Sequence, residues 1–409
     1  MEENILISAG IDVGTKNIRA VVGKLDADGK INILGYGEVA STGMRRGVVA
    51  DLATVPGAID SCLLKVEQMS GEKVDAAVVS VNGSHIICTR TDGMIAVDAH
   101  ERGIEEEDLD RLAEVASMGK VPANRETLSL VSHEYILDGQ NGIKNPIGMN
   151  GSRLEVLAST ISGLMPDCNN MYKICERAEV EPIALMPTVM ASGRAVLTSQ
   201  QMENGVAVVD MGATTTGVAI YMDGELQFVS VMPRGANDIT NDLAKVLEVV
   251  PEVAEEIKVR FVTGKFGSGS KDIEVSKENE KLKFKRAEVD EVVEARMEEI
   301  FAGVTKALRV AGYEKRLPEG VILTGGGAKM KDIDIYARQQ LGMAIRIGEP
   351  HDLKGVGNSV CKPEYSVAVG LLMRGFDEGG IASGRTNSAK KKISDSGKSK
   401  KKSIFSLFK

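Results

Sequence analysis

Two turns of similar sequence carry the residue types best suited to binding a phosphate group. Residues 12–16 read Asp-Val-Gly-Thr-Lys, and residues 210–215 read Asp-Met-Gly-Ala-Thr-Thr. Glycine lets the backbone approach a bulky anion, and threonine hydroxyls and main-chain N–H groups can line it. Lysine adds a positive charge, and aspartate holds a metal ion through water. The predicted phosphate contacts are Gly14, Thr15, Lys16, Gly212, Thr214 and Thr215, with Asp12 and Asp210 in the metal shell.

Alone, each turn is more often an ordinary β-hairpin than a ligand site. The repeat at half-chain spacing favours the ligand site, because two equivalent turns indicate two lobes with a ligand between them. A third signal lies at residues 321–328, where an apolar strand runs into Thr-Gly-Gly-Gly-Ala. Bare backbone at such a turn suits a nucleoside or a phosphate. The predicted nucleoside contacts are Gly325, Gly326 and Gly327.

The segments that hold these turns alternate between strand and helix patterns. Apolar β-rich runs flank both phosphate turns, at residues 5–22 and 205–221. Apolar residues at helical spacing predict a helix from Asp51 to Lys65, with Asp51 as its cap. An Asp92-Gly93 pair predicts the turn of a hairpin within residues 86–97, and Pro187 is expected at an early position of a helix. The whole pattern predicts an α/β fold.

Composition fits a large globular protein with a basic end. The chain has 409 residues, of which 43% are hydrophobic. This length allows two lobes of about 150–200 residues with sizeable cores. Residues 381–409 carry a net charge of +8 and the remainder −16. The acidic body argues against nucleic-acid binding, and the basic end indicates an anionic surface as its partner.

The cysteine pattern and the lengths of the apolar runs indicate the cellular compartment of the protein. The five cysteines are scattered without a C-x-x-C pair, which is typical of reduced thiols in a cytoplasm. The histidines and cysteines show no metal-binding cluster. We expect neither a signal peptide nor a membrane span, because no apolar stretch has the required length and flanks.

Taken in order, the three glycine-containing motifs resemble those of the actin, Hsp70 and sugar-kinase superfamily. The stretches at residues 41–47, 135–148, 234–242 and 365–372, with the short amphipathic end, narrow the resemblance to the FtsA family of actin-like bacterial division proteins. The resemblance covers nearly all of the chain. It implies a two-lobed actin-like ATPase fold that binds ATP and Mg²⁺ and self-associates into filaments. It also implies a tether that holds FtsZ filaments at the cytoplasmic face of the cell membrane, at the division site.

The resemblance further implies a domain organisation. An inserted domain interrupts the first lobe and contacts other subunits or later division proteins, and the second lobe has an insertion of its own. The implied boundaries are 1–83 and 159–203 for the first lobe core (1A), 84–158 for the inserted domain (1C), 204–234 and 303–378 for the second lobe core (2A), and 235–302 for the second insertion (2B). Residues 379–401 are rich in Gly, Ser and Lys and are expected to be a disordered linker.

More site residues follow from the resemblance. Gly235 is implied as a nucleotide contact. Glu255 and Lys258 lie one turn apart on a predicted helix, and related proteins use such a pair around the adenosine, although a solvent-exposed ion pair is an equal alternative. Arg286 and Arg296, on or beside a long helix predicted from residue 287 to 310, match basic positions in the FtsA site for the acidic C-terminal peptide of FtsZ. A solvated helix face explains either arginine equally well.

The last eight residues, KSIFSLFK, predict an amphipathic membrane anchor. At 100° per residue the apolar side chains cover an arc of about 160°, and lysines and serines fill the rest. Apolar groups enter the lipid boundary while lysines meet anionic head groups. The predicted membrane contacts are Lys402, Ile404, Phe405, Leu407 and Phe408. The alternative is a helix that packs on the body of the protein itself.

The second phosphate turn departs from the family pattern D-x-G-G-G-T-T. Ala213 and Thr214 replace two glycines, restrict positive φ and crowd a phosphate. No residue is assignable as the base that orients water, so the catalytic residues stay unassigned. We expect at most slow ATP hydrolysis, from an assembly protein rather than a dedicated enzyme.

Three other functions compete with this interpretation. An actin-like pilus-assembly ATPase would share the body but leaves the basic amphipathic end unexplained. A sugar-kinase-class phosphotransferase needs a catalytic aspartate facing a sugar pocket. An Hsp70-like chaperone needs a substrate-binding domain after the ATPase, where this chain has only its short basic end.

Overall fold

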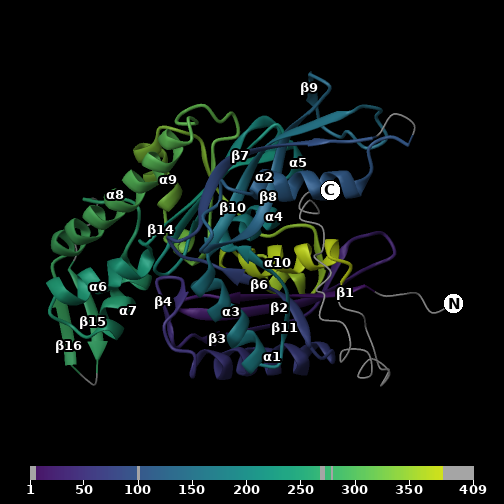
Figure 1. Cartoon of the computed structure of the whole chain (residues 1–409). Coiled ribbons are helices and arrows are strands. Elements are labelled where there is room, and N and C mark those ends of the chain that lie inside the picture. Colours follow the sequence, from purple (N-terminus) through teal and green to yellow (C-terminus); the bar gives the residue numbers. More distant parts are fainter. Residues whose placement is uncertain (1–5, 99–101, 268–271, 278–279, 381–409) are drawn as a thin grey trace.

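The computed structural model describes residues 6–98, 102–267, 272–277 and 280–380. These residues form two lobes and a third body that projects from them (Figure 1). The predicted mixed α/β architecture is confirmed. No helix among the described residues is long and apolar enough to cross a membrane.

The first lobe is built on a six-stranded sheet. Its strand order is β11-β6-β1-β2-β3-β19, with β1 antiparallel to β2 and parallel to β6. Helices α1 and α3 cover one face, and α4 and α10 cover the other. The elements are β1 (Ile7–Val13), β2 (Asn17–Leu25), β3 (Ile31–Ala40), β4 (Met44–Arg45), β5 (Val48–Val49), α1 (Val55–Ser70), β6 (Ala76–Val81), α3 (Met165–Arg177), β11 (Glu181–Pro187), α4 (Thr188–Val196), β19 (Leu353–Gly355) and α10 (Ser366–Asp377).

The second lobe repeats this hairpin-and-parallel-strand unit. Strand β12 is antiparallel to β13 and parallel to β17, as β1 is to β2 and β6. The elements are α5 (Ser199–Asn204), β12 (Val206–Met211), β13 (Thr216–Met222), β14 (Glu225–Met232), α6 (Ala236–Val246), α7 (Pro251–Phe261), β15 (Ile273–Lys277), β16 (Glu280–Phe284), α8 (Arg286–Val310), β17 (Val321–Thr324), α9 (Ile333–Leu341) and β18 (Ile345–Ile347).

The inserted body continues the sheet of the second lobe. Its strands are β7 (Ile87–Ala96), β8 (Arg125–Leu137), β9 (Gln140–Ile143) and β10 (Arg153–Leu164), and its helix is α2 (Glu106–Ser117). Together with the second lobe they form a nine-stranded sheet in the order β18-β17-β12-β13-β14-β7-β10-β8-β9. Strand β14 meets β7 through one residue pair, Ser230 with Ile87. The body has its own apolar core, centred on Leu112, Leu130 and Leu154.

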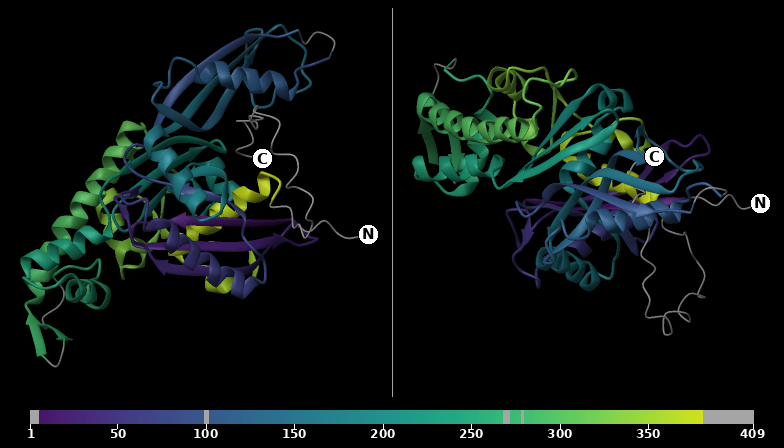
Figure 2. Two further views of the ribbon diagram at one scale, coloured as in Figure 1. Left: turned by 60° about the horizontal axis from the view of Figure 1, so that its bottom comes forward. Right: turned by 45° about the horizontal axis from the view of Figure 1, so that its top comes forward.

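Helices α4 and α10 lie between the two sheets, so that the lobes share a core (Figure 2). Val206 and Val208 of β12 belong to this shared core, while Ala207 and Val209 face the core of the second lobe. Both faces of β12 are therefore buried, which explains its continuous apolar run. At Gly370 an added Cβ would collide with the carbonyl oxygen of Ala191, so glycine is what lets the two helices cross.

Three local predictions were wrong. Asp51 does not cap the first helix, because α1 begins at Val55 with Thr54 in the N-cap position. Asp92-Gly93 is not a turn, because β7 runs without interruption from Ile87 to Ala96 and pairs with β10 throughout. A Cβ at Gly93 would lie 2.8 Å from the backbone nitrogen of Ala116, so the glycine serves the close approach of α2. Pro187 ends β11, and helix α4 begins only at Thr188.

Candidate functional site

The two predicted phosphate turns face each other across the gap between the lobes. The Thr214 hydroxyl donates to Thr15 Oγ1 at 3.0 Å, which joins the β12–β13 turn to the β1–β2 turn. The N–H of Gly47 donates to the same Thr15 oxygen at 3.0 Å. Beside this pair, Asn82 Nδ2 donates to Thr215 Oγ1, also at 3.0 Å. The structure thus brings five residues from both lobes together at one place.

Asp12 and Asp210 lie beneath these hydroxyls at the ends of β1 and β12. Each is 7% exposed. Burial raises the pKa of Asp12 to about 6, although Arg19 and a hydrogen bond to Ser80 oppose this. Burial and the neighbouring charge of Asp12 together raise the pKa of Asp210 to about 7. Burial disfavours the ionised form of both side chains. The pair is therefore suited to a divalent cation, which would stabilise both ionised forms.

The structure also indicates how such a cation would be held. No group of three or more His, Cys, Asp or Glu side chains within the described ranges is arranged to hold a metal ion. Mg²⁺ typically keeps several waters and uses one or two carboxylates together with the phosphates of its nucleotide. Asp12 and Asp210 therefore fit an Mg²⁺ that arrives with a nucleotide.

The glycine turn after β17 approaches the same aspartate. Gly325 has a φ of +82°, and a Cβ there would collide with Asp210 Oδ1. Its N–H donates to the carbonyl of Pro363 at 3.1 Å, which ties the turn to the segment before α10. Gly327 packs against Met211, whereas a Cβ at Gly326 would meet nothing within 4 Å. Gly326 therefore offers bare backbone with open space beside it, as a nucleoside would require.

The N-terminus of α6 is fastened to the second phosphate turn. The N–H groups of Ala236 and Asn237 donate to the carbonyls of Gly212 and Ala213 at 3.0 and 2.6 Å. A Cβ at Gly235 would lie 2.6 Å from the carbonyl carbon of Ala213, so this junction needs glycine. The carbonyls of the turn point toward α6. Because a trans peptide directs its C=O and N–H to opposite sides, the N–H groups of the turn point away from that helix.

Glu255 joins both lobes at the mouth of the site. Its Oε1 lies 2.5 Å from Lys16 Nζ, and its Oε2 lies 2.6 Å from Lys258 Nζ and 2.5 Å from Thr240 Oγ1. Burial alone would raise the pKa of Glu255, but the hydrogen bonds from Lys16, Lys258 and Thr240 lower it to about 2. The predicted contact between Glu255 and Lys258 is therefore present, and Lys16 turns toward Glu255.

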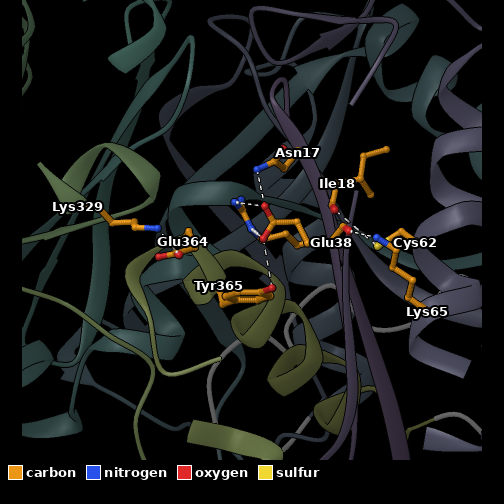
Figure 3. A network of polar contacts seen from close by, with 9 residues as sticks. Asn17, Ile18, Glu38, Cys62, Lys65, Lys329, Glu364 and Tyr365 are labelled. Carbon is orange, nitrogen blue, oxygen red and sulfur yellow. Dashed lines mark hydrogen bonds and ion pairs between the residues drawn. The ribbon is translucent and has the colours of Figure 1, made fainter. Parts of the chain in front are cut away.

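A second polar network surrounds Glu38 (Figure 3). Sequence patterns did not predict it. Arg19 lies opposite Asp12 in the β1–β2 register and donates to both oxygens of Glu38, at 3.1 and 3.2 Å. Asn17 Nδ2 and the Tyr365 hydroxyl also donate to Glu38, at 2.6 and 3.3 Å. Alternation along β2 was the available signal, since it places Arg19 on the same face of the sheet as Asp12.

A further ion pair accompanies the glycine turn. Lys329 Nζ lies 2.7 Å from Glu364 Oε1, and the Glu364 side chain is 8% exposed. Glu364 Oε2 is buried without a hydrogen-bond partner among the described residues. The pair connects the segment after Gly327 to the start of α10, one of the two helices that lie between the sheets.

The two arginines predicted to bind the FtsZ peptide lie on α8, apart from the interlobe site. Arg286 Nε lies 2.9 Å from Asp290, and Arg296 Nε lies 2.6 Å from Asp242. Arg296 also pairs with Glu299. Ten residues of helix separate the two arginines, about 15 Å along the axis. The structure does not bring them together, and each has an acidic partner.

Five predicted membrane contacts lie outside the described residues: Lys402, Ile404, Phe405, Leu407 and Phe408.

Comparisons with protein families give two matches to this chain. Residues 207–370 match the family model described as "Cell division protein FtsA". Residues 83–162 match the model described as "SHS2 domain inserted in FTSA". The second match coincides with the projecting body that contains β7 to β10.

Curated relatives resemble the chain over most of its length. "Cell division protein FtsA" of Pseudomonas aeruginosa is 32% identical over 373 residues, which are 90% of this chain and 89% of that protein. The protein of the same name from Bacillus subtilis is 32% identical over 88% of this chain and 82% of its own length. That of Escherichia coli K12 is 31% identical over 90% and 89%.

Solved structures resemble the fold at much lower identity. A chain of the "PilM-PilN type IV pilus biogenesis complex" has a TM-score of 0.65 at 15% identity, covering 90% of this chain and 98% of that one. "MreB5 of Spiroplasma citri bound to ADP" has a TM-score of 0.54 at 13% identity, covering 91% and 97%. The "MamK double helical filament" has a TM-score of 0.53 at 12% identity, covering 90% and 98%. The fold is thus actin-like.

Proposed function

Because this chain belongs to the FtsA family of cell division proteins, we propose that it is an ATP-binding, filament-forming actin homologue that tethers FtsZ filaments to the cytoplasmic membrane. Through this tether it helps to assemble the division septum. The observation that carries the proposal is the pair of facing turns with their two buried aspartates. The family membership favours this function over a pilus-assembly ATPase, a sugar kinase or a chaperone.

In this proposal ATP–Mg²⁺ lies between the lobes. Asp12 and Asp210 hold the metal ion through water, and the hydroxyls of Thr15, Thr214 and Thr215 meet the phosphates. Gly325 and Gly326 lie against the nucleoside, and Glu255 with Lys258 lies beside the adenosine. Three polar contacts that cross between the lobes support this arrangement: Thr15–Thr214, Asn82–Thr215 and Lys16–Glu255. A nucleotide bound there would hold both lobes, and filament assembly would thereby depend on ATP.

Slow hydrolysis belongs to the same proposal. Mg²⁺ would polarise the phosphates, and the chain's own groups position them. Ala213 and Thr214 stand where the family pattern has glycines. Among the described residues, the acids within the two turns are Asp12 and Asp210, both of which the metal would occupy. The nearby Glu255 is paired with Lys16 and Lys258. The protein therefore acts as an ATP-controlled assembly protein.

Three surfaces would bind the partners of this protein, which are FtsZ, other proteins of the division site and lipids. The FtsZ C-terminal peptide, which is acidic and apolar, binds beside α8 near Arg286 and Arg296. The inserted domain contacts other subunits or later division proteins. The basic end, with its apolar residues Ile404, Phe405, Leu407 and Phe408, binds anionic lipids and makes the protein peripheral on the cytoplasmic face of the membrane at the division site.

A reconstitution with anionic liposomes and FtsZ tests this function. The purified chain with ATP–Mg²⁺ should carry FtsZ into the liposome pellet, and removing ATP should reduce this, because a filament displays many tails at once and avidity rises steeply. Each apolar tail residue contributes at most about 1.5–3 kcal/mol, so a single tail should bind reversibly.

Variants of the tail separate lipid binding from nucleotide binding. Phe405→Glu with Phe408→Glu should leave the protein and FtsZ in the supernatant while ATP affinity is unchanged. Phe405→Leu with Phe408→Leu is the matched control, because it keeps the apolar arc and should still pellet. Wild-type pelleting by the glutamate variant would refute the membrane anchor.

A further inference from the structure

His85 lies at the junction of the first lobe and the inserted domain. It follows β6 of the first lobe by four residues and precedes β7 of the inserted domain by two. Its side chain is 6% exposed. Gly163, at the end of β10, allows this packing, since a Cβ there would lie 3.3 Å from the His85 ring. None of the roles assigned above to the nucleotide site involves this histidine.

Hydrogen bonds on both ring nitrogens determine its tautomer. The main-chain N–H of Leu164 donates to His85 Nδ1 at 3.1 Å, so Nδ1 carries no proton. The proton is then on Nε2, which donates to the main-chain carbonyl oxygen of Asn82 at 2.9 Å. A doubly protonated ring would direct an N–H at the N–H of Leu164. The imidazole is therefore held neutral, with one donor aimed at Asn82.

The groups that face the ring agree with this assignment. Burial lowers the pKa of His85. Asp167 on α3, 3.9 Å from Nε2, opposes this effect, whereas Arg125 on β8 adds to it. Cys168 on α3 is buried beside Gly163, and burial raises the pKa of its thiol, which is consequently uncharged. Arg125 also donates to the His85 carbonyl.

Asn82 carries the connection across to the second lobe. The N–H of Gly83 donates to Asn82 Oδ1 at 2.8 Å, which fixes the orientation of the amide. The amide nitrogen then donates to Thr215 Oγ1 at 3.0 Å. Because this oxygen accepts from Asn82, its own O–H is left to donate to an anion. A hydroxyl held in this way loses less rotational freedom when a phosphate arrives.

We propose that His85 is a positioning residue for the phosphate site, which acts through Asn82 to hold the Thr215 hydroxyl ready for a nucleotide phosphate. This inference rests on the proposed function, since it assumes a nucleotide between the lobes. Its consequence is a structural connection from the base of the inserted domain, at Leu164 and Arg125, to the phosphates.

Titration of the full-length protein with ATP–Mg²⁺ by calorimetry tests the inference. His85→Leu removes the donor to Asn82 and should weaken ATP about threefold to tenfold, the range expected for one hydrogen bond. His85→Gln places an N–H donor near the position of Nε2 and should restore affinity to within about twofold of wild type. His85→Asn keeps an acceptor for Leu164 but lacks that donor, and should bind as weakly as His85→Leu.

A double-mutant cycle shows whether His85 acts through Asn82. Asn82→Ala should weaken ATP about as much as His85→Leu, and the double variant should be no weaker than Asn82→Ala alone. His133→Leu is the matched control, because His133 is a partly buried histidine of the inserted domain and bonds to Ser159 Oγ at 2.8 Å. It should bind ATP as the wild type does.

The outcomes separate the inference from the function on which it rests. Equal affinity of wild type and His85→Leu, equal loss in the glutamine and asparagine variants, or full additivity with Asn82→Ala would each overturn the role of His85 alone. If the leucine variant does not fold, the contrast between glutamine and asparagine still decides. A wild-type protein that binds no ATP would overturn the proposed function and this inference together.

Discussion

Asp12 and Asp210 in the interlobe site and Arg286 and Arg296 on α8 are all charged groups at proposed binding surfaces, but their surroundings differ. The aspartates are buried, and Arg19 offsets their charge only in part, so their pKa values are raised. The arginines each have a carboxylate partner within 2.9 Å. Two buried carboxyls that the chain neutralises only in part are suited to binding a cation, whereas an arginine already paired with a carboxylate has its charge satisfied. A peptide at α8 must compete with partners already present.

The largest expected effect is that of Asp210→Asn. Losing a carboxylate of the metal shell should weaken Mg²⁺-dependent ATP binding by about 10- to 100-fold. The free energy of unfolding of the nucleotide-free protein should stay the same or rise, because the ionised form of Asp210 is disfavoured by burial and by Asp12. Calorimetry and urea unfolding measure the two quantities. If this variant bound ATP as tightly as the wild type, Asp210 would have no part in metal binding. The aspartates would then differ from the arginines only in being buried.

The pH dependence of ATP binding should be the next largest effect. Mg²⁺ needs ionised carboxylates, and the pKa values of Asp12 and Asp210 lie at about 6 and 7. Lowering the pH from about 8 to 6 adds protons that compete with the metal, so affinity should fall by about tenfold. In the nucleotide-free protein the sign is opposite: raised carboxyl pKa values destabilise the folded state at high pH, and this cost disappears as the pH falls toward about 4.

Asp210→Asn is the control for this pH profile, because it removes the group with the higher pKa. Its affinity should vary less between pH 6 and 8 than that of the wild type, in parallel titrations with correction for the ionisation of ATP itself. Parallel profiles for the two proteins would contradict the assignment of the pH dependence to Asp210.

Charge reversal on α8 should have a smaller effect. Arg286→Glu with Arg296→Glu should weaken binding of the acidic FtsZ peptide by about threefold to tenfold, from the ~0.2–1 kcal/mol typical of each partly exposed ion pair. The loss should be greater at low salt, where screening is weaker. Arg309→Glu is a matched control, since Arg309 lies on the same helix, pairs with Glu314 and is 69% exposed. Equal effects of both changes would indicate net charge rather than a site.

The smallest expected effect is that of Lys16→Met. Lys16 is 52% exposed and pairs with Glu255 across the mouth of the site, so its loss should cost at most about 1 kcal/mol of unfolding free energy. With its charge held by Glu255, ATP affinity should change less than about threefold. A loss of tenfold or more would show that Lys16 leaves Glu255 for the phosphates, as the sequence motif predicts.

Features encoded in short stretches were predictable from the sequence. The two phosphate turns, the glycine turn after β17 and the contact of Glu255 with Lys258 each depend on a few neighbouring residues. Asp92-Gly93 misled because its conformation is decided by α2, which packs on β7 and needs the missing Cβ at Gly93. A local turn signal carries no information about such tertiary packing.

Contacts between distant parts of the chain were beyond sequence patterns. Asn82 meets Thr215 across 133 positions and Lys16 meets Glu255 across 239. Neither pair has a fixed spacing that a motif could express. Arg19 was within reach, because its place opposite Asp12 follows from the alternation of β2 and the hairpin register.

The nine-stranded sheet has a mechanical consequence at its narrowest point. Strand β7 pairs with β10 along its whole length but with β14 only at Ile87 and Ser230. When a load is applied between the inserted domain and the second lobe, the junction with the fewest backbone hydrogen bonds yields before the fully paired strands do. The inserted domain would then come away from the lobe as an intact unit, with β7 to β10 still paired and able to dock again when the tension is released.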